Sequence, residues 1–399
     1  MITRFHVRNY KALRDVTLDL DRERMHVLIG PNDAGKTSVL EAIAALCRSV
    51  DHPLAEAFAG RWEGRELVWN GGEESDGVVG LQAMLNEDAG DYELACTFRP
   101  RGRGVVQQSE TITVSSEDGS APFHLPQTRR SDSWVYRAVW RQGSPEGVDS
   151  RSFELVHDAL TGVRLHRWVP ELLSLPVAPY KRRAFDLEST GFGLALCLED
   201  ILGDDRDRFN ALEERFRRIF TGIAQIKFRP EGAYTATPHP QTDVPLLTEG
   251  EGKGLHFQLR SGTVIPASQV SDGALLVLAY LAILMSPAAP RVLLVEEPEN
   301  GVHPALLKNV LSILRELIAE QDRTQVILTT HSPYVLDLFE PQEVTLLTKE
   351  ANGEVRAHRL SESETVKSQI DTFTLGEIWT AEGDDSLAGR KSADQGNKL

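Results

Sequence analysis

An eight-residue glycine loop constrains this chain more than any other feature. The segment GPNDAGKT, residues 30–37, matches the pattern GxxxxGK[ST]. A compact apolar segment, Met25 to Ile29, runs straight into it, and from Ser38 to Cys47 apolar residues recur at helical spacing. Strand, glycine loop and helix in this order let backbone N–H groups surround a phosphate in front of a helix N-terminus. We therefore predict a phosphate-binding loop between a buried strand and an amphipathic helix.

Two residues of this loop are expected to carry specific chemistry. Lys36 should reach the β- and γ-phosphate oxygens, and the hydroxyl of Thr37 should ligate Mg²⁺. The predicted phosphate-contacting residues are Gly30, Asn32, Ala34, Gly35, Lys36, Thr37 and Ser38.

Two adjacent acidic residues end a second apolar segment. Val292 to Val295 is expected to be a buried strand, and Glu296 and Glu297 follow it directly. Ligands of α/β sheets bind at the carboxyl ends of strands, and buried carboxylates are costly unless a cation or a reaction uses them. We expect Glu296 to serve the Mg²⁺ shell and Glu297 to polarise an attacking water. An acidic pair that complements a helix dipole is the structural alternative.

His331 and Ser271 complete the candidate residues. His331 follows the expected strand Gln325 to Leu328, so it also stands at the carboxyl end of a strand, although a lone histidine is often structural. The segment Ser271-Asp272-Gly273 precedes an apolar helix expected from Ala274 to Met285. Ser271 or its neighbour would cap this helix, and an exposed capped N-terminus also attracts anions, so both interpretations stay open.

The order of the expected elements favours an α/β fold. Helices and strands alternate from residue 274 to 331, which is typical of a mainly parallel sheet with flanking helices. Two short alternating strands open the chain and predict an antiparallel β N-terminal lobe. We expect four parts: an N-terminal core segment 1–60, an inserted lobe 61–185, a C-terminal core segment 186–350 and an extension 351–399. The polar tail after Ala381 is expected to be disordered.

The composition restricts the cellular setting. Fifty-nine acidic against 43 basic residues give a net charge of −16, which opposes indiscriminate binding to nucleic acid or anionic membrane. Cys47, Cys96 and Cys197 form no CxxC pair, so neither a disulfide framework nor a zinc hook is indicated. The most apolar stretch, 274–285, is too short to span a bilayer. We expect a cytoplasmic chain with no membrane partner.

The order of the motifs resembles the ABC-ATPase clan. GPNDAGKT, VSDGAL, VLLVEEPEN and TTHS occur in the order of Walker A, signature, Walker B and switch histidine. EEPENGVHP and TTHSPYVLDLF are similar to segments of AAA_15/AAA_21-type ATPases, relatives of the RecF, SMC and OLD families. The resemblance covers residues 1–50 and about 185–350. It implies a P-loop NTPase of ABC-ATPase type with ATP and Mg²⁺ as cofactors.

The same resemblance implies residue roles and a dimer. Lys36, Glu297 and His331 would be catalytic, while Thr37 and Glu296 would hold the metal. Two copies would join head to tail around two ATP molecules. Ser271 and Gly273 would then contact a γ-phosphate bound by the other copy, and Asn300 to His303 would cross the dimer interface. An oligomer larger than this homodimer stays open.

The chain also departs from the family pattern. Glu296 stands where Walker B usually has aspartate, and no glutamine among Gln82, Gln107 and Gln108 has a pattern that marks it as the Q-loop residue. About 50 residues follow Leu347, too few for the TOPRIM nuclease domain of OLD-type proteins.

Three basic clusters bear on possible partners. Arg129, Arg130, Arg137 and Arg141 interleave with Trp134, Tyr136 and Trp140; the other clusters are Lys181 to Arg183, and Arg215, Arg217 and Arg218. Interleaved cations and rings suit nucleic-acid binding, and a partly exposed strand pair is the structural alternative for the first cluster. A solvated face is the structural alternative for each of the other two clusters. If the clusters converge they would form a DNA groove, and if they disperse a protein partner is favoured.

Two functions follow from this sequence. The first is an ATP-hydrolysing dimerisation switch in DNA repair and maintenance or in anti-phage defence, with DNA as a candidate partner. The alternative is an ATP-binding regulatory scaffold for a separately encoded effector protein such as a nuclease, with little turnover alone.

Overall fold

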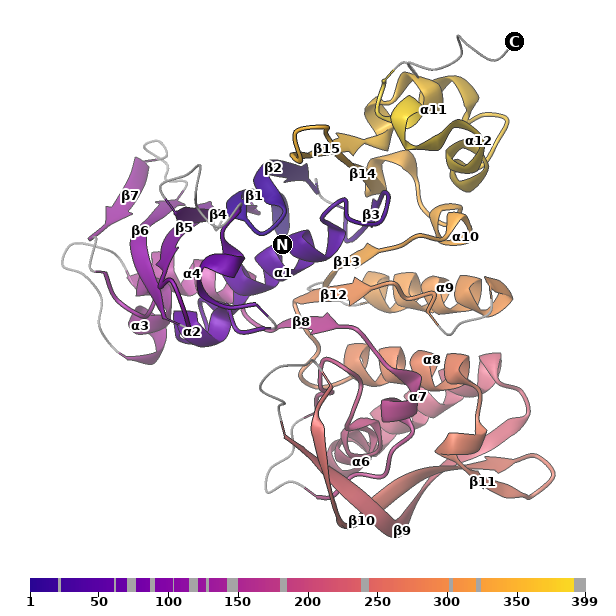
Figure 1. Cartoon of the computed structure of the whole chain (residues 1–399). Helices are drawn as coiled ribbons and strands as arrows, with labels where there is room; N and C mark the ends of the chain where they lie inside the picture. Colours follow the sequence, from indigo (N-terminus) through magenta and orange to yellow (C-terminus); the bar gives the residue numbers. More distant parts are fainter. Residues whose placement is uncertain are drawn as a thin grey trace. The chain divides into compact units, whose positions relative to one another are not determined.

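The structure is a computed structural model whose elements are labelled in Figure 1. It describes residues 1–390 except 21–22, 61, 70–76, 87–89, 103, 115–120, 127–128, 142–149, 180–184, 238–243, 301–303 and 321–323. The chain divides into two compact units. The first comprises Met1–Leu165, Arg291–Glu297 and Arg323–Leu399, and the second comprises His166–Pro290 and Pro298–Asp322. The four-part division expected from the sequence stays a prediction.

A mainly parallel sheet lies in the first unit. Its strand order is β15-β14-β3-β13-β12-β8. The strands are β3 (Met25–Ile29), β8 (Val163–His166), β12 (Val292–Glu296), β13 (Gln325–Thr329), β14 (Val344–Lys349) and β15 (Val355–Arg359). Parallel pairing joins β14 to β3, β3 to β13 and β13 to β12. β15 pairs antiparallel with β14. Every residue of β3 and β13 is buried, which explains their mostly apolar sequence.

An antiparallel sheet of order β2-β1-β4-β5-β6-β7 completes the strands of this unit. Its members are β1 (Ile2–Tyr10), β2 (Leu13–Asp19), β4 (Val78–Leu85), β5 (Asp91–Phe98), β6 (Val105–Val114) and β7 (Ala121–Leu125). The expected antiparallel N-terminal lobe is therefore present. It is larger than expected, because β4 to β7 extend the sheet that β1 and β2 begin.

Helix α1 (Lys36–Arg48) contacts both sheets of the first unit. It touches β1 and β4 of the antiparallel sheet and β12 and β13 of the parallel sheet. Val39, Leu40, Ile43 and Leu46, all predicted to face the core, are at most 1 % exposed. The phosphate loop is thus followed by a helix that the core holds on two sides.

The first unit contains six further α-helices among the described residues. They are α2 (Leu54–Ala57), α3 (Trp134–Trp140), α4 (Ser150–Leu160), α10 (Pro333–Leu336), α11 (Glu364–Gln369) and α12 (Leu375–Leu387), with 3-10 turns at Gly64–Leu67, Pro341–Glu343 and Leu360–Glu362. The expectation of disorder after Ala381 is wrong as far as Arg390, because α12 continues to Leu387. Gly383 has φ +74° and marks a kink in α12.

The second unit is built around helix α8 (Asp272–Leu284). All residues from Gly273 to Leu284 are buried, and the helix contacts α5, α6, α7 and α9. A helix that is apolar on every side requires such surroundings. The surrounding helices are α5 (Pro170–Leu173), α6 (Leu194–Asp204), α7 (Arg206–Ile219) and α9 (Pro304–Glu320). No helix in the described part of the chain is long and apolar enough to cross a bilayer.

A three-stranded antiparallel sheet of order β11-β10-β9 belongs to the same unit. Its strands are β9 (Ile223–Thr237), β10 (Leu246–Leu259) and β11 (Val264–Pro266), followed by a 3-10 turn at Ala267–Gln269. Apolar residues mark only part of each long strand, residues 224–228 and 255–259. The other halves are largely exposed and rich in Gly, Glu and Thr, so no apolar alternation marks them.

Glu110 is a buried carboxylate in the antiparallel sheet of the first unit. It accepts hydrogen bonds from the Tyr92 hydroxyl (3.0 Å), the Gln107 amide (2.8 Å) and the backbone N–H of Trp134 (2.7 Å). Burial raises the pKa of Glu110 from 4.5 to about 7, although these bonds oppose the shift. The carboxyl group thereby joins β6 to the start of α3.

The raised pKa predicts how stability depends on pH. Between pH 4.5 and about 7 the folded state binds more protons at Glu110 than the unfolded state, so this group's contribution to the free energy of unfolding falls as pH rises. The loss is roughly 3 kcal/mol, because one pKa unit corresponds to about 1.4 kcal/mol. Denaturant titrations should show the wild type losing this much stability relative to Glu110→Gln across that window. The exposed Glu56→Gln control should follow the wild type; a difference independent of pH would refute the assignment.

Candidate functional site

A cavity of about 240 Å³ opens in the first unit. Three segments far apart in sequence form most of its wall: the loop after β3, the end of β12 and the end of β13. The lining residues are Ala12, Asn32, Asp33, Ala34, Gly35, Lys36, Thr37, Ser38, Glu296, Glu297, Thr329 and His331. The structure thus brings together the predicted loop residues from Asn32 onward, the acidic pair and the histidine.

The turn from β3 into the loop depends on Gly30. Its φ is +137°, and a Cβ at this position would lie 2.1 Å from the carbonyl oxygen of Leu347 in β14. Only glycine fits such a close approach of two backbones. Gly35, with φ +83°, then forms the N-cap of α1. Gly30 shapes the loop from outside the cavity lining, whereas Gly35 lies in it.

Lys36 lies almost entirely inside the loop. Its side chain is 7 % exposed, and Nζ donates to the carbonyl oxygens of Gly30 (2.8 Å) and Pro31 (3.0 Å). A buried ammonium group is costly unless such acceptors surround it. The loop therefore holds one positive charge at the cavity, where an anionic ligand can meet it.

The register of the parallel sheet places the end of β12 beside the end of β13. Glu296 is opposite Thr329, and Thr329 is opposite Leu28 of β3. The Thr37 hydroxyl donates to the Glu296 carboxylate, which joins the first turn of α1 to the end of β12. Hydroxyl and carboxylate oxygens are the donors that Mg²⁺ prefers, so this pair fits a magnesium ion that keeps several water ligands.

Glu297 has an unusual backbone conformation. Its φ is +47°, in the left-handed region, and its N–H donates to the Thr329 carbonyl (3.1 Å). This conformation costs roughly 1–3 kcal/mol in a residue other than glycine and persists where the surroundings hold it, often at functional sites. The carboxylate Oε1 lies 3.4 Å from Nε2 of His331, and both side chains are about one-third exposed. The pair is thus positioned to hold a water molecule or a proton in the cavity.

The residues around His331 fix its loop. The Thr330 N–H donates to the Leu28 carbonyl (3.1 Å), and the Ser332 N–H donates to the Thr330 hydroxyl (3.0 Å). Five residues after Ser332, Asp337 accepts a bond from the Gly376 N–H (2.8 Å) at the start of α12. The loop is therefore held by β3 on one side and by the C-terminal helices on the other.

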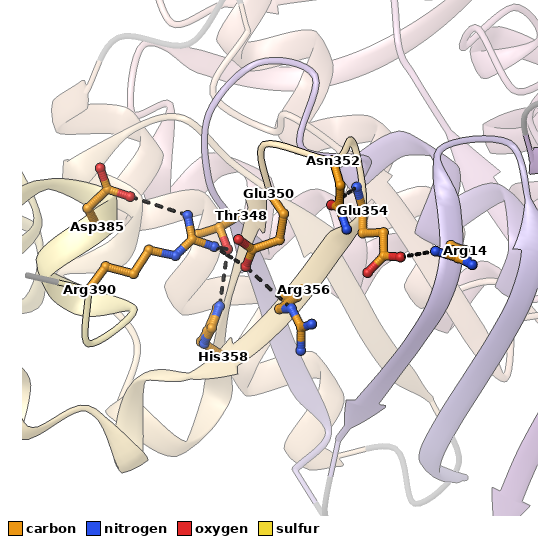
Figure 2. Close-up of polar contacts among 9 residues, drawn as sticks. All are labelled: Arg14, Thr348, Glu350, Asn352, Glu354, Arg356, His358, Asp385 and Arg390. Carbon is orange, nitrogen blue, oxygen red and sulfur yellow. Dashed lines mark hydrogen bonds and ion pairs between the residues drawn. The ribbon is translucent and has the colours of Figure 1, made fainter.

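Lys349, at the end of β14, forms an ion pair with Asp33 of the phosphate loop. The adjacent Glu350 accepts bonds from Arg390 (2.5 Å) and lies 3.3 Å from Arg356, as Figure 2 shows. Arg390 also donates to Thr348 (3.0 Å). These contacts connect the end of the described chain to β14, which pairs with β3, the strand before the phosphate loop.

The second unit contains the predicted signature residues. Ser271 is exposed at the N-cap of α8 and its side chain makes no capping bond, whereas Gly273 is buried. Ser271 therefore occupies the expected N-cap position, but the expectation that its side chain caps the helix is wrong. Asn300 is exposed, and residues 301–303 of the expected interface loop lie outside the described residues.

The first basic cluster is helical. Residues 134–140 form α3, so the alternative of a strand pair is wrong. Trp134 is buried, and the guanidinium groups of Arg130 and Arg137 each lie 5.3 Å from its ring. These rings and cations engage one another within the protein. Lys181 to Arg183 lie outside the described residues, and Arg215 pairs with Glu320 (2.7 Å).

Sequence reasoning missed three lining residues. Thr329 ends β13 directly before the predicted histidine segment, so its position at the strand end could have identified it. Asp33 lies inside the recognised loop, but its pairing with Lys349 joins residues 316 positions apart. Ala12 belongs to the turn between β1 and β2, and no local pattern marks it.

Two family models match the chain. One, described as "AAA domain, putative AbiEii toxin, Type IV TA system", matches residues 150–337. The other, described as "AAA ATPase domain", matches residues 1–95. No curated protein matches the sequence.

Several solved structures are similar to this chain. The SMC head domain from Thermotoga maritima is 13 % identical, with 90 % of this chain and 98 % of that chain covered and a TM-score of 0.43. An Smc head bound to the C-winged helix domain of ScpA is 13 % identical, with coverages of 90 % and 97 % and a TM-score of 0.49. An Smc head with an extended coiled coil, bound to the C-terminal domain of ScpA derived from Pyrococcus furiosus, is 12 % identical, with coverages of 93 % and 99 % and a TM-score of 0.50. The last likeness shows a shared fold, and the predicted P-loop fold class is confirmed.

Proposed function

We propose that this chain, an AAA-type ATPase of the ABC-ATPase clan by its family matches and its fold, binds ATP with Mg²⁺ and hydrolyses the γ-phosphate. One observation supports this most strongly: Lys36, the Thr37–Glu296 pair and the Glu297–His331 pair line a single cavity of about 240 Å³. A cation for phosphates, oxygen ligands for a metal and a carboxylate for water are the parts that phosphoryl transfer to water requires.

Each residue has a distinct task in this proposal. Lys36 exchanges its carbonyl contacts for phosphate oxygens, and Thr37 and Glu296 hold Mg²⁺, which neutralises phosphate charge when bound. Glu297 orients the attacking water and accepts its proton. His331, 3.4 Å from that carboxylate, keeps it aimed at the water.

We further propose that ATP joins two copies of the chain and that hydrolysis separates them. Ser271 of one copy would meet the γ-phosphate held by the other, and its exposed hydroxyl, which caps nothing in its own helix, leaves it available for that contact. The biological setting would be DNA repair and maintenance or anti-phage defence. The match to a model described with a type IV TA system favours defence.

Phosphate release by the purified chain tests the enzymatic part of this proposal. With ATP and Mg²⁺ we expect steady turnover that stops when the metal is chelated. ATP binding without turnover would instead support the regulatory scaffold, whose effector should then co-purify with the chain.

The Asp33–Lys349 ion pair gives a further prediction. Lys349→Ala leaves the Asp33 carboxylate facing the triphosphate without its cation, so ATP binding should weaken about two- to fivefold at low salt and less at high salt. Titration of a fluorescent ATP analogue measures this. Adding Asp33→Asn to the same chain should restore binding, and failure of that rescue would argue against a charge effect.

A further inference from the structure

An open concavity of about 750 Å³ lies in the second unit, where α7 ends and β9 begins. The last turn of α7, the start of β9 and the residue after β10 line it; all three elements are labelled in Figure 1. The lining residues are Glu214, Arg217, Arg218, Thr221, Ile223, Ala224 and Arg260. Three of these seven side chains are arginines.

Backbone contacts bring these arginines together from distant parts of the sequence. Arg217 and Arg218 come from the last turn of α7, and Arg260 follows β10. The Arg260 N–H donates to the Gly222 carbonyl (3.0 Å), which fixes the two segments side by side. The Arg217 guanidinium donates to the Ala224 carbonyl (3.2 Å), so this side chain is held along the wall.

The cluster carries surplus positive charge. Arg218 pairs with Glu214 (2.8 Å), and this is the acidic side chain among the lining residues. Two arginines remain, and within the described ranges the Arg260 guanidinium has neither a hydrogen bond nor an ion pair. Cations near the C-terminus of a helix complement its dipole, which accounts for Arg217 and Arg218. Arg260 lies outside α7 and needs another explanation.

The lining indicates the chemical class of the ligand. Guanidinium groups and the Thr221 hydroxyl donate hydrogen bonds to phosphate oxygens, and arginine suits them because its donors form a planar fork. Among the described lining residues there is no aromatic ring on which a base could stack, so the lining suits a sugar–phosphate backbone. The net charge of −16 opposes unspecific binding elsewhere, so a local basic site would decide where such a polymer binds.

We propose that the cluster of Arg217, Arg218 and Arg260 binds the phosphate backbone of a nucleic acid. This site is separate from the residues assigned to ATP and does not depend on ATP turnover. The contact is independent of base sequence, since backbone contacts position a nucleic acid and do not read it.

Fluorescence anisotropy of a labelled oligonucleotide with the full nucleotide-free chain tests the proposal. Replacing Arg217 and Arg260 with alanine together should weaken binding about tenfold at low salt. The slope of log K against log salt should fall by about 1.4 for a single strand and about 1.8 for a duplex. Replacing Arg206 and Arg208 with alanine together, which removes the same two charges from the first turn of α7, should leave binding at the wild-type level. Circular dichroism checks that all variants are folded.

Three results would overturn the proposal. The wild type could fail to bind the oligonucleotide, or the double variant could bind it as tightly as the wild type with an unchanged salt slope. In the third, the double variant loses affinity for inorganic phosphate but not for the oligonucleotide, which would identify a small-anion site. Because no ATP is present in this experiment, none of these outcomes bears on the ATPase proposal, which phosphate release tests separately.

Discussion

Glu297→Gln is expected to slow phosphate release by about 10²- to 10⁴-fold while ATP stays bound. Glutamine keeps the size of the side chain, but its amide cannot accept the proton of the attacking water. The backbone N–H of residue 297 still donates to Thr329, so the strained turn should persist. Phosphate release and retention of labelled ATP, measured on the same sample, check both parts.

A matched control is Glu171→Gln in α5, an exposed carboxylate in the other unit. It should turn over at the wild-type rate. If Glu297→Gln also keeps that rate, Glu297 is not the residue that acts on water and the assignment of the cavity must be revised.

Lys36→Ala is expected to weaken ATP binding about 10²-fold and to abolish turnover with it. The substitution removes the charge-assisted hydrogen bonds to the phosphates, each contributing on the order of 1.5–3 kcal/mol. It also leaves the Gly30 and Pro31 carbonyls without the donor they have in the wild type. Titration of a fluorescent ATP analogue measures the loss.

Lys308→Ala on the exposed side of α9 removes the same charge elsewhere and should bind ATP normally. The two site variants should differ in kind, since Lys36→Ala loses the nucleotide whereas Glu297→Gln retains it. Undiminished ATP binding by Lys36→Ala would contradict the role of the phosphate loop.

The sequence predicted those parts of the site that depend on residues close together in the chain. The apolar run of β3 and the helical spacing of α1 locate Lys36 and Thr37, because glycines between a strand and a helix leave the chain few other paths. The runs before Glu296 and His331 predict strands, and parallel strands bring their carboxyl ends to one edge of a sheet. This reasoning predicted that Glu297 and His331 would lie at the same edge of the sheet.

The rest depends on pairings between distant residues. The pairing of β14 with β3 brings Asp33 to Lys349 and Gly30 to Leu347. No periodic pattern in the sequence predicts which strand pairs with β3. The rings and cations around α3 fit strand and helix patterns equally well. The hydrogen bond from the Trp134 N–H to the buried Glu110 carboxylate favours the helix, and this contact exists only in the folded chain. Arg260 lies in the same cluster as Arg217 for a similar reason, because its N–H bonds to the Gly222 carbonyl, 38 positions earlier in the chain.

The proposed switch requires ATP to hold two copies together until it is hydrolysed with the help of Glu297. Light scattering on Glu297→Gln, with and without ATP and Mg²⁺, tests this most directly. We predict the mass of one chain without nucleotide and twice that mass with ATP, and the same dimer should fail to form when Lys36→Ala is added. A single-chain mass in the presence of bound ATP would contradict the switch and leave an ATPase that works as a monomer.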